Sequence, residues 1–193
     1  MPKLGMEPIR RAALVKATIE EIGAEGSLEV TVARIAKRAG MSSALAHHYF
    51  GSKDEIFLAA MRHILSVYGA EVRGALVMAK SPRDRVEAVI RAGFSESNFR
   101  PATIAAWLHF YVLAQKSPAA ARLLAVYQGR LRSNLVHGLR PICGTAAPGI
   151  ADRIAALIDG LYLRTGLSGA GPRGPGATAD VLLALEAEIN NAT

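Results

Sequence analysis

A short polar stretch beginning at Ser43 has the side chains that could read DNA bases. Ser43, His47 and His48 carry hydroxyl and imidazole groups, which hydrogen-bond to the edges of base pairs, and the methyl group of Ala44 can contact the methyl group of thymine. Leu45, the neighbouring alanine and Phe50 are apolar and are expected to pack inward. The pattern predicts one helix face that is turned toward a nucleic acid.

The charge around this stretch favours the same interpretation. No Asp or Glu occurs between Val30 and Lys53, whereas Arg34, Lys37, Arg38 and Lys53 give this segment a charge of +4, against +7 for the whole chain. A local field of one sign attracts the phosphate backbone of DNA. The alternative is a small helical hairpin with a solvated basic face.

Local signals predict two short helices that would hold these side chains. Thr31 and Ser42 can each cap a helix N-terminus, because a hydroxyl oxygen accepts a hydrogen bond from a free backbone N–H group. Gly40 follows the first helix, at the position where many helices end with a residue in the left-handed backbone conformation, which favours glycine. The second helix should end near Phe50 and Gly51. Two short helices joined by a glycine-containing turn form a helix-turn-helix, whose second helix enters a DNA major groove.

The rest of the chain predicts an all-α fold without any persistent strand pattern. Helical periodicity, capping serines and prolines at helix starts define the expected elements. The stretch from Gly169 to Gly176 contains four Gly and two Pro and predicts a loop. Helices are expected over about residues 8–25, from Ser52 into the seventies, 82–98, 102–115, 118–140, 148–168 and 177–190.

Composition excludes several classes of protein. The chain has 193 residues, of which 51% are hydrophobic, enough for a substantial core, and a single cysteine, which rules out a disulfide framework. We find no apolar run of membrane-spanning length and no secretory signal, so a cytoplasmic protein is expected. The five histidines and Cys143 show no metal-ligand spacing, and no catalytic motif is present, so neither an enzyme nor a metal site is expected. Cys143 is interpreted as a loop thiol, with redox sensing as an alternative.

The N-terminal segment resembles the tetracycline-repressor (TetR) family of transcription regulators. The resemblance implies a three-helix DNA-binding domain over residues 1–53, and a helical ligand-binding and dimerisation domain over 54–193, about nine helices in all. It also implies phosphate contacts by Thr31, Tyr49 and Lys53. The matching residues are Thr31, Ile35-Ala36, Ala39-Gly40-Met41-Ser42, Tyr49-Phe50, Lys53 and Ile56. The predicted DNA-binding residues are therefore Thr31, Ser42, Ser43, Ala44, His47, His48, Tyr49 and Lys53.

Nearly the whole chain is similar to the BetI-type branch of that family, the choline-responsive repressors of the glycine betaine pathway. The resemblance implies a homodimer that binds a palindromic operator and leaves it when choline binds, without a cofactor. His47, Tyr111 and Tyr162 depart from the expected pattern. The matching segments are Met1–Met6, Ile9–Arg11, His48–Phe50, Ala106–Leu108, Ser133–Val136, Ala156–Leu161, Leu163-Arg164 and Leu167–Gly169.

Aromatic side chains in the larger domain are the candidates for an effector site. Aromatic faces attract a quaternary ammonium, which cannot donate a hydrogen bond, and an acid nearby can add negative charge. The predicted ligand-binding residues are Trp107, Tyr111, Tyr162, Asp159 and Phe94.

Two alternatives stay open. No acid occurs between Ser97 and Ala151, where six basic residues do occur, which would suit an anionic or lipophilic effector. The second alternative belongs to another functional class, a small-molecule-binding protein whose basic N-terminus docks on a protein partner.

The predicted dimer interface lies on the last two helices. Apolar residues recur at helical spacing on both, and two such helices from each subunit would form a four-helix bundle. The predicted interface residues are Ile154, Leu157, Ile158, Leu161, Leu182 and Leu185.

Overall fold

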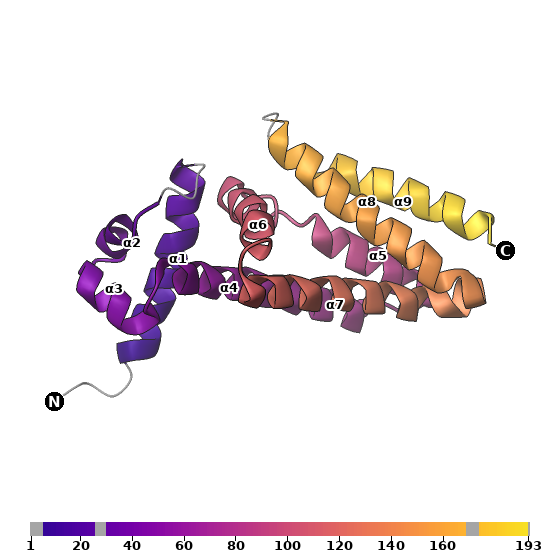
Figure 1. Ribbon diagram of the computed structural model, residues 1–193. Coiled ribbons are helices and arrows are strands. Elements are labelled where there is room, and N and C mark those ends of the chain that lie inside the picture. Colours follow the sequence, from indigo (N-terminus) through magenta and orange to yellow (C-terminus); the bar gives the residue numbers. More distant parts are fainter. Residues whose placement is uncertain (1–5, 26–29, 169–173, 193) are drawn as a thin grey trace. The chain divides into compact units, whose positions relative to one another are not determined.

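The computed structural model describes residues 6–25, 30–168 and 174–192, and every regular element in them is helical, which confirms the all-α prediction (Figure 1). A single 3-10 turn, Gly144–Ala146, separates two of the helices. The helices are α1 (Met6–Glu25), α2 (Val32–Arg38), α3 (Ser43–Phe50), α4 (Lys53–Met78), α5 (Pro82–Gly93), α6 (Pro101–Ala114), α7 (Pro118–Cys143), α8 (Ala147–Leu167) and α9 (Gly174–Asn190).

The chain divides into two compact units. The first comprises Met1–Leu65 together with Pro101–Ala121, and the second comprises Ser66–Arg100 together with Arg122–Thr193. The boundary therefore falls inside α4, and α6 groups with the three N-terminal helices. This division differs from the predicted one, which placed the whole chain after residue 53 in a single domain.

The predicted helix-turn-helix is present in the first unit. The Thr31 hydroxyl accepts a hydrogen bond from the backbone N–H of Arg34, at 3.3 Å, and the Ser42 hydroxyl accepts one from that of Leu45, at 3.2 Å. Gly40, between the two helices, has a φ of 68°, the left-handed conformation that glycine adopts most easily. Buried apolar residues from α1, α2 and α3 hold the three helices together: Leu14, Ala17, Ile22, Ile35, Ala36 and Ala46.

Helix α6 packs closely on α1 within the same unit. A methyl group added to Gly23 would lie 2.4 Å from Cβ and 2.6 Å from Cα of Ala102. Only a residue without a side chain allows the two backbones to approach this closely. The α1–α6 contact is therefore a backbone-to-backbone contact, and a larger residue at position 23 would separate the helices.

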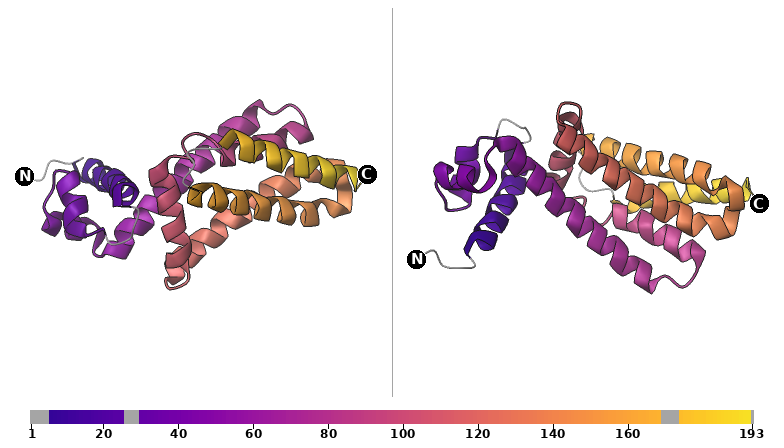
Figure 2. Two further views of the ribbon diagram at one scale, coloured as in Figure 1. Left: turned by 90° about the horizontal axis from the view of Figure 1, so that it is seen from above. Right: turned by 60° about the horizontal axis from the view of Figure 1, so that its bottom comes forward.

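The second unit is a helical bundle in which α8 and α9 lie side by side (Figure 2). Its core contains Ile150, Ile154 and Ile158 of α8 together with Val181 and Leu185 of α9, all of them buried. Ion pairs tie the surface of α9 to its neighbours, through Arg83 with Glu186 and Arg153 with Glu188.

Helix α5 ends at Gly93, five residues before the predicted end. In the following segment one side chain binds a carbonyl that a continuing helix would use, and another binds a side chain of α4. The Asn98 amide donates to the carbonyl of Ala92 at 2.9 Å, and the Ser95 hydroxyl donates to Glu71 at 2.8 Å. Ser and Asn compete in this way with backbone helical hydrogen bonds, so the apolar pattern up to residue 98 overestimated the helix.

Two other helix ends differ from the prediction. Helix α7 continues through Pro141 to Cys143, so Cys143 is a buried helix-terminal residue and its interpretation as a loop thiol was wrong. Burial raises the pKa of the Cys143 thiol, which disfavours the thiolate needed for redox chemistry. Helix α9 begins at Gly174, because Pro175 suits a first helical turn. Residues 169–173 of the predicted loop, the expected helix end at Gly26 and residues 1–5 lie outside the described part of the chain.

Candidate DNA-binding and effector-binding sites

Helix α3 exposes most of the side chains that were predicted to contact DNA. Ala44, His47 and His48 are exposed on this helix, whereas Ala46 is completely buried and Leu45 and Phe50 are partly buried. The outward and inward faces are thus those expected from the sequence. Ser43 is partly buried, and contact with DNA stays a prediction for all of these residues.

The capping hydroxyls can still take part in phosphate binding. Thr31 and Ser42 are both exposed, and each hydroxyl accepts one backbone hydrogen bond. A hydroxyl group has one donor and two acceptor positions, so capping leaves its proton for a phosphate oxygen. Both residues can therefore cap a helix and contact the DNA backbone at once.

Two arginines of α1 hold the C-terminal end of α3, a role that the sequence pattern did not reveal. Arg11 donates a hydrogen bond to the backbone carbonyl of Tyr49 at 2.6 Å, and its guanidinium lies 4.5 Å from the centre of the Phe50 ring. Arg10 donates to the Tyr49 hydroxyl at 3.4 Å. Because the carbonyls at a helix end lack partners within the helix, Arg11 stabilises the end of α3 and fixes its position on α1.

Two of the four cations predicted to attract phosphate are engaged with carboxylates of α1. Arg34 pairs with Glu21 at 3.2 Å and with Glu25, and Arg38 pairs with Glu20 at 3.7 Å and with Glu21. The hydrogen bond from Arg34 lowers the pKa of Glu25. The absence of acids between residues 30 and 53 was therefore misleading, because the neutralising acids come from α1.

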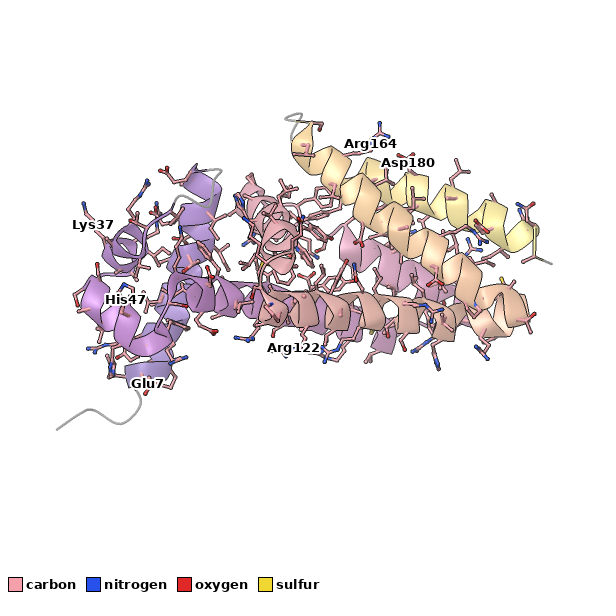
Figure 3. The ribbon with its side chains drawn as sticks, viewed as in Figure 1. Glu7, Lys37, His47, Arg122, Arg164 and Asp180 are labelled. Carbon is pink, nitrogen blue, oxygen red and sulfur yellow. The ribbon has the colours of Figure 1, made fainter. Side chains whose placement is uncertain are left out.

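The two lysines of this segment are placed differently. Lys37 is exposed and projects away from the helices in Figure 3. Lys53 is partly buried, and its ammonium lies 5.4 Å from the centre of the Phe57 ring. The predicted phosphate contact by Lys53 is compatible with this position, since a long side chain can cover a ring and still present its charge to a phosphate.

The predicted ligand-binding residues fall into separate groups. Trp107 and Tyr111 belong to α6 in the first unit, with ring centres 5.7 Å apart, and the Trp107 ring also meets that of Phe110 at 5.9 Å. The expected closeness of these two rings, one helical turn apart, is confirmed. Phe94, Asp159 and Tyr162 belong to the second unit.

Asp159 lies beside a pair of tyrosines in the second unit. The Tyr127 hydroxyl donates a hydrogen bond to the Asp159 carboxylate at 3.2 Å, and the Tyr68 ring meets the Tyr127 ring edge-on at 5.8 Å. Burial raises the pKa of the Asp159 carboxyl, while the hydrogen bond from Tyr127 opposes part of that rise. Burial also raises the pKa of the Tyr68 hydroxyl, with contributions from the charges of Asp159 and Glu71.

Glu71 is an acid that the sequence analysis overlooked. Its carboxylate accepts hydrogen bonds from the hydroxyls of Ser95, at 2.8 Å, and Ser97, at 2.5 Å, and the residue is partly buried. Glu96, which lies between these two serines in the sequence, is exposed instead. Tyr68 and Glu71 are three residues apart on α4, a spacing that puts an aromatic ring and an acid on one helix face and could have identified them.

Tyr162 and Phe94 belong to a buried aromatic group that anchors the segment after α5. The Tyr162 hydroxyl donates to the backbone carbonyl of Asn98 at 2.7 Å. The Phe99 ring lies between those of Phe94, at 5.7 Å, and Tyr162, at 5.1 Å. Asp159 accepts a hydrogen bond from Tyr127, so the Tyr68–Tyr127 pair, which the sequence analysis did not single out, lies beside this carboxylate.

The predicted dimer residues divide into two sets. Ile154, Ile158 and Leu185 are buried within the protomer, where they stabilise its own core. Leu157, Leu161 and Leu182 keep part of their surface exposed and can contact a partner. Arg164 and Asp180, labelled in Figure 3, are exposed on α8 and α9. The interface prediction therefore rests on the second set and stays a prediction.

The described part of the chain contains neither a metal-binding group nor a membrane-spanning helix. Over residues 6–25, 30–168 and 174–192, no group of His, Cys, Asp and Glu side chains could hold a metal ion. None of the helices in these ranges combines the length and the apolar character that crossing a membrane requires.

Comparison with protein families matches both parts of the chain. Residues 14–60 match the family described as bacterial regulatory proteins, tetR family, and residues 82–189 match the C-terminal domain of the BetI-type transcriptional repressor. The chain is 50% identical over 180 residues to the HTH-type transcriptional regulator BetI of Brucella anthropi, covering 93% of each protein. It is 50% identical over 171 residues to BetI of Rhizobium meliloti, covering 88% of this chain and 84% of that protein.

Solved structures share the fold. A transcriptional regulator from Pseudomonas aeruginosa PAO1 aligns with a TM-score of 0.83 and 27% identity, covering 98% of this chain and 94% of that one. A regulator from Saccharomonospora viridis, solved in complex with choline, aligns with a TM-score of 0.78 and 20% identity, covering 91% of this chain and 95% of the other. These relatives are transcriptional regulators, a class of DNA-binding proteins, and they are not enzymes. The chain belongs to the TetR family of transcriptional regulators, and it is a repressor of the BetI type.

Proposed function

We propose that this repressor acts as a homodimer on a palindromic operator and is released by choline, in control of genes for choline uptake and glycine betaine synthesis. TetR-family regulators bind operator DNA and usually combine dimerisation with a small-molecule effector. Operator binding also implies a location with the chromosome, in the cytoplasm. The observation that carries the choline assignment is the carboxylate of Asp159 beside the rings of Tyr127 and Tyr68.

This cluster has the chemistry that a quaternary ammonium requires. The trimethylammonium group of choline carries a positive charge but no N–H donor, so aromatic faces and a carboxylate are its suitable partners. Asp159 is partly buried, and a cation beside it would favour its ionised form. A protein of the same fold has been crystallised with choline, so the fold can hold this ligand.

Trp107 and Tyr111 stay part of the proposal as a second aromatic pair. Trp is the strongest aromatic partner for a cation, and these two rings lie 5.7 Å apart on α6. Loss of one of these rings should weaken choline binding by about 1–2 kcal/mol, roughly a tenfold or greater loss of affinity.

Release of the operator would then follow from differential affinity. Two recognition helices of a symmetric dimer fit successive major grooves when they are about 34 Å apart. If choline binds more tightly to a conformation with another spacing, it shifts the population away from DNA binding. The ligand can shift this equilibrium only by the difference between its two affinities.

The decisive experiment measures operator release as a function of choline concentration. We expect Asp159→Asn and Trp107→Ala to bind operator normally in the absence of choline but to need at least tenfold more choline for release. Trp107→Phe should fall between. Val126→Ala, a change of an exposed residue on α7, serves as the control. Wild-type protein whose operator complex ignores millimolar choline would overturn the assignment and favour an anionic effector, with Arg100, Arg122 and Arg130 as the next residues to test.

A salt titration separates DNA binding from the alternative in which the basic N-terminus docks on a protein. For a DNA-binding repressor, the logarithm of the affinity falls linearly with the logarithm of the salt concentration, because binding releases cations from the phosphates. Lys53→Ala should lower this slope by about one unit for every sequence tested. A protein without salt-dependent affinity for any palindromic duplex would instead favour the docking alternative.

A further inference from the structure

His47 is held by its own helix end through two hydrogen bonds to one residue. The backbone N–H of Gly51 donates to the carbonyl of His47 at 2.7 Å, and Nδ1 of the His47 ring lies 3.0 Å from the carbonyl oxygen of Gly51. Gly51 has a φ of 75° and a ψ of −64°, a conformation that glycine adopts far more easily than other residues, and its carbonyl faces the ring. The ring of an exposed histidine on the recognition helix is thereby fixed in orientation.

This contact also determines which ring nitrogen carries the proton. A carbonyl oxygen can only accept a hydrogen bond, so Nδ1 must be the donor. In the neutral imidazole one nitrogen is a donor and the other an acceptor, and Nε2 is therefore an acceptor here. Gly51 thus gives the exposed side of the His47 ring a defined hydrogen-bonding character.

We propose that His47 reads the operator as a hydrogen-bond acceptor, pairing through Nε2 with an exocyclic amino group in the major groove. Only the N6 amino group of adenine and the N4 amino group of cytosine donate hydrogen bonds there. The inference rests on the proposed function, because it requires α3 to lie in a major groove. It goes further in assigning to one residue the chemical group that it recognises.

The fixed ring favours specificity over general affinity. A side chain that is already oriented loses little conformational freedom when it meets its partner, so a misplaced base edge cannot be accommodated by rotation of the ring. Guanine O6 and N7 and thymine O4 are acceptors. They could not form a hydrogen bond with Nε2, which is also an acceptor. His47 should therefore discriminate by exclusion as well as by pairing.

The first arm of the test measures the tautomer in the free protein. Nitrogen-15 NMR at pH 8, with the His47 signals identified by their loss in His47→Ala, should show a protonated Nδ1 and an unprotonated Nε2. Gly51→Ala places a residue with a side chain at positive φ, although its Cβ would meet no other atom within 4 Å. This variant should reduce the population of the Nδ1–H tautomer.

The second arm measures base reading. A duplex selected from a random pool by the wild-type protein is resynthesised with single analogues that lack the amino group, nebularine for adenine or 2-pyrimidinone for cytosine. We expect one analogue in a half-site to weaken wild-type binding about three- to tenfold, the effect of one hydrogen bond, and to leave the affinity of His47→Ala unchanged. His47→Arg, which can only donate, should select guanine at that position. His63→Ala, a change of an exposed histidine on α4, is the matched control.

The possible failures are distinguishable. If the wild-type protein enriches no duplex, the proposed function fails and the base assignment fails with it. If a duplex is enriched but no amino group matters, or if its removal affects wild type and His47→Ala equally, only the role of His47 is overturned. A protonated Nε2 in the free protein would overturn the tautomer argument regardless of DNA binding.

Discussion

At the scale of single residues, Arg11 links the first helix to the recognition helix by two kinds of contact. Its hydrogen bond to the Tyr49 carbonyl and its position over the Phe50 ring both act on the last turn of α3. A guanidinium can make both contacts at once because it is planar and has several donors. A residue on α1 therefore affects DNA recognition although it belongs to neither helix of the helix-turn-helix.

We predict that Arg11→Ala lowers the free energy of unfolding by about 1–2 kcal/mol, since one charge-assisted hydrogen bond and one cation–π contact are lost. Operator affinity should fall as well, because the end of α3 loses its anchor. Arg11→Lys keeps the charge but not the planar group and should be intermediate. Thermal unfolding together with DNA titration would check both effects, and unchanged DNA binding by a destabilised Arg11→Ala would restrict the role of this residue to stability.

Asp159 gives the proposed effector site a pH dependence whose sign can be worked out. Burial raises its pKa in the folded protein. At a pH between the unfolded and the folded pKa, the native state therefore holds a proton that the unfolded chain has released. Stability from this group is therefore present at low pH and is lost as pH rises from the unfolded pKa to the folded one. A bound cation favours the carboxylate and lowers this pKa.

We therefore predict that choline affinity rises with pH through the folded pKa of Asp159 and that binding in this window releases a proton. Calorimetry in buffers of different ionisation enthalpy measures that release directly. Asp159→Asn should bind choline more weakly and show neither the proton release nor this pH dependence. Proton release that persists in Asp159→Asn would assign the linkage to another group.

At the scale of helices, the sequence predicted what depends on near neighbours. Thr31 and Ser42 cap helices as predicted, and Gly40 takes the positive φ predicted for the turn; all three act on residues only a few positions away. The interactions that were missed join distant parts of the chain, such as Arg38 with Glu21 and Asp159 with Tyr127. Periodicity carries no information on which helix faces which, and so the local charge pattern overestimated the cations available to DNA.

The α1–α6 contact yields a prediction for Gly23. In Gly23→Ala the new methyl group must push α6 away from α1, since the nearest atoms belong to the backbone and Cβ of Ala102. We expect a loss of about 1–3 kcal/mol in unfolding free energy. Because α6 carries Trp107 and α1 holds α3 through Arg11, operator affinity and the choline concentration needed for release should change together.

The control for this variant is Gly74→Ala, on α4, where an added methyl group would meet no other atom within 4 Å. Replacement of a helical glycine by alanine without crowding is expected to be neutral or stabilising by about 0.5–1 kcal/mol. Gly74→Ala should therefore keep both DNA binding and the choline response. A Gly23→Ala variant that alters stability alone would show that α1 and α6 are packed together but not functionally coupled.

At the scale of the whole molecule, the proposed dimer depends on the part of α8 and α9 that the protomer leaves partly exposed. Leu157, Leu161 and Leu182 belong to this surface. A charge placed there would lose its hydration in the dimer without gaining a partner, at a cost of several kcal/mol. Leu161 is the most direct choice because it lies outside the buried core of the protomer.

We predict that Leu161→Asp is monomeric and no longer binds a palindromic operator tightly, since two linked half-sites are then read by separate molecules. Sedimentation velocity reports the association state. Val126→Asp places the same charge on an exposed position of α7 and should remain dimeric. An intact dimer of Leu161→Asp would locate the interface on another surface.

The close approach of Gly23 to Ala102 has a consequence for building chimeric repressors. Exchange of the DNA-binding segment between related regulators is attractive when its boundary is a point along the chain, such as residue 53. Here the segment carries one half of a matched surface whose other half is encoded about 80 residues later. A donor segment with any side chain at position 23 would collide with the recipient's α6, and so a working hybrid has to inherit positions 23 and 102 from the same parent.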